Sequence, residues 1–362
     1  MSKPLAERAY RMPAEWEPHE ATWIAWPHNR DDWPGKFAAI PWVYAEIVRH
    51  LHQAETVRIL VNRPHGERAA RQVLEKLPLD WGRIAFLPVP TDRTWTRDYL
   101  PTVVLGEEGD TRWIKWRFNA WAKYPNWQRD NAAALRVGAY LDRPAPCSGP
   151  VFENGTEVVL EGGSIDVNGQ GLLLTTEECL LSDVQQRNPG ATRQDYELVF
   201  AKYLGVRKVL WLGRGIAGDD THGHVDDLAR FVGPRTVVSV VEDDPRDANY
   251  VPLQENLERL RGMTDLEGRP LEVATLPMPA RLEFEGQRLP ASYANFYIAN
   301  DRVLVPTFND PNDRKALAIL ADLFPGRTVV GIHAVDLVWG LGTLHCLTQQ
   351  QPRDAIPVVK KR

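Results

Sequence analysis

The chain has few cysteines and no excess of positive charge. Three cysteines among 362 residues do not make a disulfide framework, so we expect a reducing compartment. With 43 basic and 48 acidic residues the net charge is −5, which gives no reason to expect nucleic acid as a partner. Residues 1–8 have no apolar signal core, and no later run is long enough to span a bilayer. We therefore expect a cytoplasmic protein without a membrane partner.

What the chain does contain is typical of a globular protein with a large core. Hydrophobic residues make up 43% of the chain and charged residues 25%. Thirteen tryptophans crowd residues 16–33 and 95–127 in particular, and we expect most of them in the core and a few around a pocket for a flat cation. No linker or low-complexity run divides the sequence, so we expect one domain over residues 1–362.

The first ninety residues alternate between strand and helix patterns. Apolar strand patterns cover residues 22–26, 57–61 and 84–89, and helical patterns cover 38–53 and 67–77. This alternation predicts an α/β fold.

A different unit then recurs, in which a polar loop enters a hairpin that a helix often follows. The predicted hairpins cover 102–105 with 113–118, 165–167 with 172–175, 228–232 with 236–241, and 296–298 with 303–306; the helices cover 192–204, 250–261 and 313–323. If equivalent units pack around an axis, their leading loops converge on one cavity. Those loops carry Asp98, Glu161, His224, Asp226 and Asn295, and Cys346 opens the last predicted strand.

Cys346 follows a turn that contains Gly340 and Gly342. A thiol beside such a turn can be exposed and can have a lowered pKa. Cys147 and Cys179 lie in a proline-rich loop and an apolar run, as inert thiols do. In a strand, His345 would point away from the Cys346 side chain, which favours His224 as the imidazole that works with the thiol.

A cysteine, a histidine and several carboxylates in one cavity suit a particular chemistry. The thiolate is a nucleophile and the imidazole a general acid and base. Additional carboxylates suit a planar cation such as a guanidinium, which pairs with them bidentately, and each charge-assisted hydrogen bond contributes about 1.5–3 kcal/mol. This set requires no metal or other cofactor.

Two alternatives from other classes stay open. The run Thr221–Asp227 resembles the zinc signature of metallo-β-lactamase-fold hydrolases, with His222, His224 and Asp226 as ligands, although Asp227 stands where that signature ends in histidine. The other alternative is a catalytically silent binding protein on the same fold.

Taken together and in this order, the motifs resemble the agmatine deiminase and Porphyromonas-type peptidylarginine deiminase branch of the guanidino-group-modifying superfamily. The resemblance spans most of the chain and rests on residues 12–19, 95–98, 118–121, 160–164, 223–226 and 346–352.

The resemblance implies a five-bladed, pseudo-symmetric α/β propeller of ββαβ-type modules. It also implies that Cys346 is the nucleophile, that His224 is the acid and base, and that Glu161 orients the substrate or His224. Asp98 and Asp226 would hold the guanidinium. The implied reaction, which belongs to putrescine and polyamine biosynthesis, hydrolyses agmatine to N-carbamoylputrescine and ammonia through a covalent amidino-cysteine intermediate.

The chain departs from the family pattern in loops that line the family's pocket. These departures are Tyr99–Leu100 after the Arg-Asp pair, Leu341 in the glycine turn, and residues 122–125 in place of a glycine-rich stretch. They leave other guanidines open as substrates: arginine, peptidyl-arginine or another alkylguanidine.

Several residues are candidates for holding the substrate beyond its guanidinium. An ammonium tail would need an acidic or aromatic partner, for which the candidates are Trp95, Trp121, Asp219 and Asp220. Arg97 and Arg214 are candidates for a substrate carboxylate, and Asn295 either contacts the substrate or satisfies backbone groups at a strand end. A homo-oligomer is left open.

Two reagents separate the thiol chemistry from the zinc alternative. We expect iodoacetamide to abolish guanidine hydrolysis, because it alkylates the nucleophile, and EDTA to leave the rate unchanged. Ammonia release after each treatment is the measurement. Loss of activity with EDTA and its persistence after alkylation of Cys346 would favour the zinc hydrolase.

Overall fold

The computed structural model describes residues 10–141 and 149–353, so the expectations for residues 1–8 and Cys147 lie outside the described residues. The α-helices are α1 (Ile40–Ala54), α2 (Arg63–Leu74), α3 (Thr96–Tyr99), α4 (Gln128–Tyr140), α5 (Glu177–Leu181), α6 (Arg193–Leu204), α7 (Tyr250–Arg261) and α8 (Pro311–Leu323). The strands are β1 (Tyr10–Arg11), β2 (His19–Ala25), β3 (Thr56–Leu60), β4 (Ile84–Leu87), β5 (Thr102–Gly106), β6 (Thr111–Ile114), β7 (Asp166–Val167), β8 (Leu172–Thr176), β9 (Lys208–Leu212), β10 (Ala229–Phe231), β11 (Thr236–Val241), β12 (Glu272–Pro277), β13 (Glu283–Phe284), β14 (Gln287–Arg288), β15 (Tyr297–Ile298), β16 (Arg302–Thr307), β17 (Thr328–His333) and β18 (Gln349–Pro352).

The α/β architecture consists of small separate sheets. Within the described ranges the strands form five sheets of three or four strands, in the orders β1-β5-β6, β7-β8-β9, β10-β11-β12, β15-β16-β17 and β18-β2-β3-β4, and one β13-β14 ribbon. In four of these sheets an antiparallel pair is extended by a parallel strand, as β9 extends β8, β12 extends β11, β17 extends β16 and β3 extends β2. Each parallel strand is reached through a helical crossover, as a parallel pairing requires.

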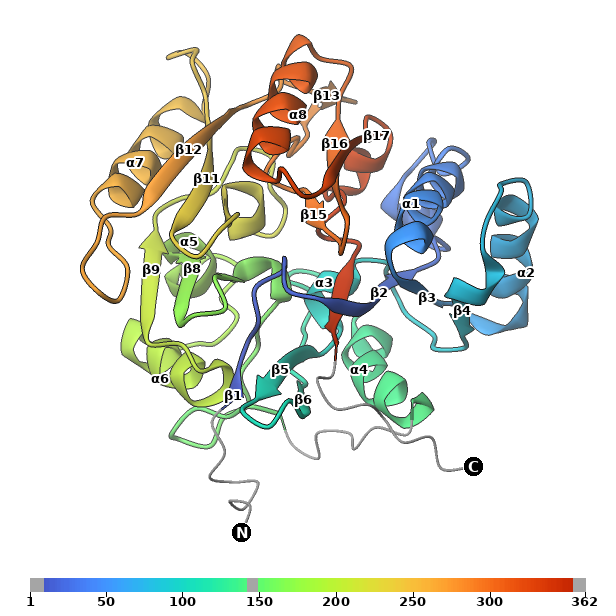
Figure 1. Ribbon diagram of the computed structural model, residues 1–362, viewed down its shortest axis with the longest axis horizontal. Coiled ribbons are helices and arrows are strands. Elements are labelled where there is room, and N and C mark those ends of the chain that lie inside the picture. The colour runs from blue at the N-terminus through green and yellow to red at the C-terminus, as the bar shows by residue number, and fades with distance from the viewer. Residues whose placement is uncertain (1–9, 142–148, 354–362) are drawn as a thin grey trace.

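Figure 1 shows how these units are arranged. Helices α1, α2, α4, α6, α7 and α8 lie toward the outside, whereas the one-turn helix α3 lies near the centre. The last strand, β18, pairs antiparallel with β2, so the C-terminal end of the described chain joins the sheet of an early strand. The short turns that carry the predicted site residues therefore come from different sheets and meet near the middle.

Local sequence accounts for several of these elements. The buried residues of α1 include Ile40, Tyr44, Ile47, Val48 and Leu51, which lie along one face of a helix.

Helix α6 begins after a capping box. The side chains of Thr192 and Asp195 accept hydrogen bonds from each other's backbone N–H groups there. Gly205 caps the C-terminus of the helix with a φ of 70°, the left-handed conformation that glycine adopts readily.

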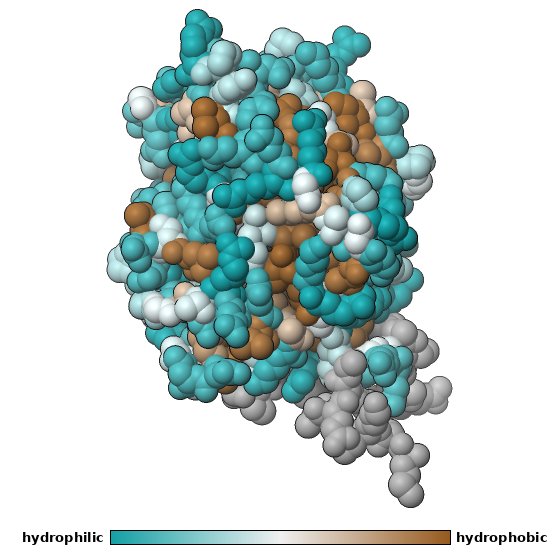
Figure 2. Space-filling view, turned by 90° about the vertical axis from the view of Figure 1, so that its left-hand side faces the viewer, coloured by the Kyte–Doolittle hydropathy of each residue, from teal (hydrophilic) through white to brown (hydrophobic). Residues whose placement is uncertain are grey.

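The core and the surface match the composition. Eight of the tryptophans in the described ranges are buried: Trp23, Trp26, Trp33, Trp95, Trp113, Trp116, Trp121 and Trp211. Figure 2 shows a mostly hydrophilic face on which hydrophobic residues lie in small groups between polar ones. None of the helices in the described part of the chain has the length and apolar character needed to cross a bilayer.

The sequence predicted most of the elements and misplaced a few. The predicted strand 236–241 and helix 250–261 coincide with β11 and α7, and the other predicted elements are found with ends shifted by a few residues. The elements that were not predicted are the helices α3, α4 and α5, the short strands β1, β13 and β14, and the parallel strands β9, β12 and β17. Cys346 does not open a strand: it lies in a turn, three residues before β18.

Candidate active site

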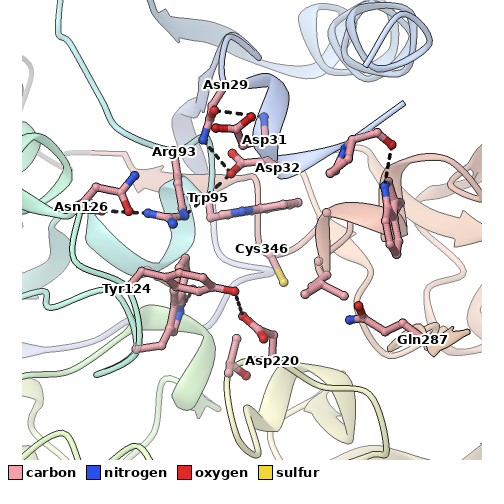
Figure 3. Close-up of a pocket in the computed structure, with 18 residues that line it drawn as sticks. Asn29, Asp31, Asp32, Arg93, Trp95, Tyr124, Asn126, Asp220, Gln287 and Cys346 are labelled. Carbon is pink, nitrogen blue, oxygen red and sulfur yellow. Dashed lines mark hydrogen bonds and ion pairs between the residues drawn. The ribbon is translucent and has the colours of Figure 1, made fainter. Parts of the chain in front are cut away.

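The site is a cavity of about 480 Å³ near the middle of the molecule. Five of the predicted site residues line it: Trp95, Asp98, Trp121, Asp220 and Cys346. Glu161, His224, Asp226 and Asn295 do not line it and are fully or almost fully buried. Figure 3 shows the Cys346 sulfur directed into the space between Trp95, Tyr124, Asp220 and Gln287.

Three short turns bring the polar groups together. Asp98 lies on α3, Glu161 precedes the 3-10 turn η4 (Gly162–Ser164), and His224 precedes the 3-10 turn η5 (Val225–Asp227) that carries Asp226. η4 packs against both α3 and η5. The backbone N–H of Arg97 donates to the Cys346 carbonyl at 3.1 Å and ties the cysteine turn to α3.

Asn295 organises the cysteine turn. Its Oδ1 accepts hydrogen bonds from the Thr343 hydroxyl at 2.7 Å and from the His345 N–H at 3.0 Å. Its Nδ2 donates to Cys346 Sγ at 3.1 Å and to Asp227 Oδ1 at 2.9 Å. Asn295 therefore holds the sulfur in place, and its contact with substrate stays a prediction.

The environment of the thiol differs from the expectation. Cys346 is only 6% exposed, although it lines the cavity. Burial raises the pKa of the thiol well above its usual value, and Asp226, Asp227 and Asp98 raise it further. Proximity to the glycine turn was expected to lower this pKa, which was wrong because the surrounding carboxylates oppose a thiolate.

Asp98 is fixed by two donors and a close backbone approach. Trp121 Nε1 donates to its Oδ2 at 2.9 Å and the Gly163 N–H to its Oδ1 at 3.0 Å. A Cβ at Gly163 would lie 2.5 Å from His224 Nδ1 and 3.0 Å from carboxylate oxygens of Asp98 and Asp226, so only glycine fits here. Burial raises the pKa of Asp98 to about 6, against the opposing effect of His224.

The His224 ring lies among three carboxylates. Its Nδ1 is 3.9 Å from Asp98 Oδ1 and 4.0 Å from Asp226 Oδ1, and its Nε2 is 3.6 Å from Glu161 Oε2. Burial alone would lower the pKa of His224, but Asp98, Cys179 and Glu161 together raise it well above its usual value. Neither ring nitrogen has a hydrogen-bond partner among the described residues, and neither has Asp226 Oδ1.

Glu161 is held by Arg187, which the sequence did not single out. Arg187 Nε donates to both Glu161 carboxylate oxygens, at 3.2 and 3.3 Å, and both side chains are fully buried. Burial would raise the pKa of Glu161, but Arg187 and then His224 lower it, so the carboxylate stays charged beside the imidazole. Arg187 also donates to the Thr221 carbonyl, in the loop that leads to His224.

His345 does not point away from the site, as alternation in a strand predicted. Because residues 344–347 form a turn, its Nδ1 lies 2.6 Å from Asp226 Oδ2, and its Nε2 lies 2.8 Å from Glu15 Oε2. The same Asp226 oxygen is 3.8 Å from Cys346 Sγ. His345 and Cys346 therefore both face Asp226, and His345 supports that carboxylate from behind.

Glu15 anchors a deeper ionic layer that the sequence did not reveal. It lies 3.0 Å from Arg230 Nη2 and 3.2 Å from Arg97 Nη2, and all three side chains are buried. Burial would raise the pKa of Glu15, but Arg230, His345 and Arg97 hold it well below its usual range. Glu15 lies 330 positions from His345, so no local pattern connects them.

The candidates for the substrate tail have distinct environments. Asp220 accepts hydrogen bonds from Lys123 Nζ and, at 2.7 Å, from the Tyr124 hydroxyl. Asp219 instead caps its own loop, accepting from the N–H groups of Thr221, Gly223 and His224.

Neither arginine candidate lines the cavity. Arg97 is buried against Glu15, and Arg214 is an exposed side chain 3.6 Å from Glu255.

An acidic side chain at the other end of the cavity was missed by sequence reasoning. Asp32 lines the wall, accepts a hydrogen bond from Asn29 Nδ2 at 2.9 Å and lies 3.8 Å from Arg93 Nε. Burial raises its pKa to about 7. Its Oδ2 has no hydrogen-bond partner among the described residues. Two consecutive aspartates after a strand were the available signal.

The zinc-hydrolase alternative finds no support in the structure. His222 has a φ of 62°, and its Nε2 lies 3.1 Å from the Ser182 hydroxyl rather than beside His224. One carboxylate oxygen of Asp226 already contacts His345. Among the described residues, His222 and Asp226 are not part of the one cluster of potential metal ligands that contains His224.

Cys179 lies beside His224 and Glu161, which its apolar sequence context did not indicate. It is buried in α5, and its sulfur, one His224 ring nitrogen and a Glu161 oxygen all lie within 4.8 Å of one another.

Comparisons with known proteins place the chain in a family. The family of Porphyromonas-type peptidyl-arginine deiminases matches residues 11–352. A protein named agmatine deiminase from Pseudomonas aeruginosa is 36% identical, over 97% of this chain and 97% of its own. Among solved structures, the agmatine deiminase of Enterococcus faecalis superposes with a TM-score of 0.85 at 34% identity, covering 95% of this chain and 96% of that one.

A second solved structure is a cysteine-to-serine variant of the Campylobacter jejuni agmatine deiminase with substrate bound. It is 27% identical, with a TM-score of 0.86, and covers 98% of this chain and 99% of its own. Because the family match spans nearly the whole chain, the protein belongs to the Porphyromonas-type peptidyl-arginine deiminase family of guanidino-group-modifying enzymes. It is an enzyme that acts on carbon–nitrogen bonds, on the α/β fold of these deiminases.

The raised pKa of Cys346 predicts a pH dependence of its alkylation. Only the thiolate reacts, so in the free protein the rate should keep rising past pH 9, by about tenfold per pH unit while the thiol is still protonated. Mass spectrometry of the Cys346 peptide after timed iodoacetamide treatment measures the rate, with free glutathione as the control. A rate that levels off at or below neutral pH would contradict the assignment.

Proposed function

We propose that the protein is an agmatine deiminase, which hydrolyses the guanidine of agmatine to N-carbamoylputrescine and ammonia. The relatives named above carry this activity in their names. The physical support comes from the cavity itself, where a thiol faces carboxylates that suit a planar cation.

One observation carries the proposal. Both nitrogens of His224 and Oδ1 of Asp226 are buried without hydrogen-bond partners among the described residues, next to Asp98 and Cys346. Buried polar atoms are almost always paired. Asp226 Oδ1 therefore suits a ligand with several N–H donors, which a guanidinium has. Protonated His224 Nδ1 suits a nitrogen that becomes basic once the guanidinium carbon is attacked.

In the first half of the reaction, Asp98 and Asp226 hold the guanidinium nitrogens on either side of its carbon. The positive charge of the substrate offsets the carboxylates that raise the pKa of Cys346, so binding lowers that pKa and the thiol proton passes to solvent. The thiolate attacks the guanidinium carbon. His224, whose raised pKa keeps it protonated, gives its proton to the departing nitrogen, which leaves as ammonia.

The second half reverses these roles. The remaining amidino group is bonded to Cys346 Sγ, and His224, now neutral, takes a proton from a water molecule that attacks the same carbon. Collapse of the tetrahedral intermediate breaks the carbon–sulfur bond, and the thiolate regains a proton as the ureido product departs. Glu161 and Arg187 hold the imidazole in position throughout.

The cavity wall favours a cationic tail over a carboxylate. Among the described residues it carries Asp31, Asp32, Asp98 and Asp220, against Arg93 as the one basic side chain. The far ammonium of agmatine would meet an acidic and aromatic wall that includes Trp95 and Trp121. Arginine would add a carboxylate to the same wall, which like-charge repulsion disfavours.

We propose a propeller fold and a cytoplasmic location for this enzyme. Five sheets of three or four strands, four of them built as an antiparallel pair extended by a parallel strand, support a single-domain five-bladed α/β propeller of ββαβ-type modules. Free thiols at Cys179 and Cys346 fit a reducing, cytoplasmic compartment. Homo-oligomerisation stays a prediction.

Ammonia release from a substrate panel tests the proposal. We expect kcat/KM for agmatine to exceed that for arginine by about 100-fold or more, because arginine places an uncompensated carboxylate against the acidic wall.

Cys346→Ala should abolish turnover and retain agmatine binding, measured by calorimetry, because Asp98 and Asp226 remain.

Cys147→Ser is the matched control, since it removes a thiol outside the proposed machinery, and it should turn over at the wild-type rate. Ammonia release from agmatine by the Cys346→Ala protein would reject the thiol mechanism. Equal rates with arginine and agmatine would reject the assigned substrate.

A further inference from the structure

The proton-transfer imidazole has a second thiol beside it. Cys179, on α5, is 1% exposed, and its sulfur lies within 4.8 Å of a His224 nitrogen and of a Glu161 oxygen. Nothing in the deiminase reaction uses this sulfur, because the attack comes from Cys346. A thiol, an imidazole and a carboxylate together are the ligand types that zinc prefers.

We propose that Glu161, Cys179 and His224 form a binding site for a thiophilic divalent cation of the zinc class, and that this cation inhibits the enzyme. The inhibition rests on the proposed function, because it works by removing His224 from proton transfer. The ion here is no catalyst, and His222 and Asp226 are not among its ligands.

The orientation of the ring favours this site. Nδ1 faces Asp98 and Asp226, toward the position proposed for the substrate, whereas Nε2 faces Glu161 at 3.6 Å. Nε2 is fully buried and has no hydrogen-bond partner among the described residues. Once it gives up its proton, Nε2 is a ligand atom directed toward a carboxylate that can share a cation with it.

The three candidate ligand atoms need to move only slightly to bind one zinc ion. Tetrahedral zinc with ligand bonds of 2.0–2.3 Å places its ligand atoms about 3.3–3.8 Å apart. The three atoms here lie within 4.8 Å of one another, so side-chain shifts of about an ångström close the site.

The local charges also favour a cation. Asp98 and Asp226 lie 3.9 and 4.0 Å from His224, and Glu161 adds a third carboxylate. Arg187, bonded to Glu161, is the opposing charge. Binding would displace two protons, one from the Cys179 thiol and one from Nε2 of the His224 imidazolium. The metal-bound neutral imidazole keeps only its Nδ1 proton and is a much weaker acid toward the departing nitrogen.

Binding is tested first without any assay of activity. In a Cys147→Ser/Cys346→Ala protein, Cys179 is the one remaining thiol. Titration with Co²⁺ should produce thiolate-to-cobalt absorption that saturates at one ion per chain. Adding Cys179→Ala should remove this absorption and weaken Co²⁺ binding at least about tenfold by calorimetry. Absence of the absorption, or equal affinity after the added substitution, would overturn the site.

Inhibition is tested in Cys147→Ser protein that retains Cys346. The Zn²⁺ concentration that halves ammonia release should rise at least about tenfold with Cys179→Ala, each variant being compared with its own metal-free rate. Unchanged inhibition would overturn the inhibitory role, even if cobalt binds.

Cys179→Ser is the second variant if alanine unfolds α5, as judged by circular dichroism. Cobalt binding without turnover of any guanidine would reject the proposed function alone.

Discussion

The repulsion between a thiolate at Cys346 and the carboxylates around it is the constraint on which the site depends. Asp226, Asp227 and Asp98 all raise the pKa of this thiol, and burial raises it most. The sulfur is therefore a poor nucleophile until a cation enters the cavity and offsets those charges. Selectivity and activation thus have one cause, because a neutral urea such as the product cannot activate the thiol as a guanidinium does.

Keeping so many acids buried requires a second layer of compensating charges. Arg187 holds Glu161, His345 holds Asp226, and Arg230 and Arg97 hold Glu15 behind them. These contacts join segments from both ends of the chain and from its middle. These ion pairs hold the carboxylates in place, whereas Asp226 Oδ1 and the His224 nitrogens have no hydrogen-bond partner among the described residues.

The sequence predicted the fold class and the chemical identity of the site, but not its electrostatics. Strand and helix periodicity located most elements, and the residue types at Cys346, His224, Asp98 and Asp226 indicated guanidine chemistry. The orientation of His345 was wrong because alternation applies only inside a strand, and residues 344–347 form a turn. The Glu15 layer and the position of Cys179 depend on contacts between distant segments, for which one sequence carries no signal.

The most direct measurement is the mass of the Cys346 peptide after rapid mixing with agmatine and acid quenching. If the thiolate attacks the guanidinium carbon and ammonia leaves first, this peptide gains the mass of agmatine less that of ammonia, and the adduct decays as N-carbamoylputrescine appears. Turnover at the full rate with the Cys346 peptide unmodified at every time point would contradict the account.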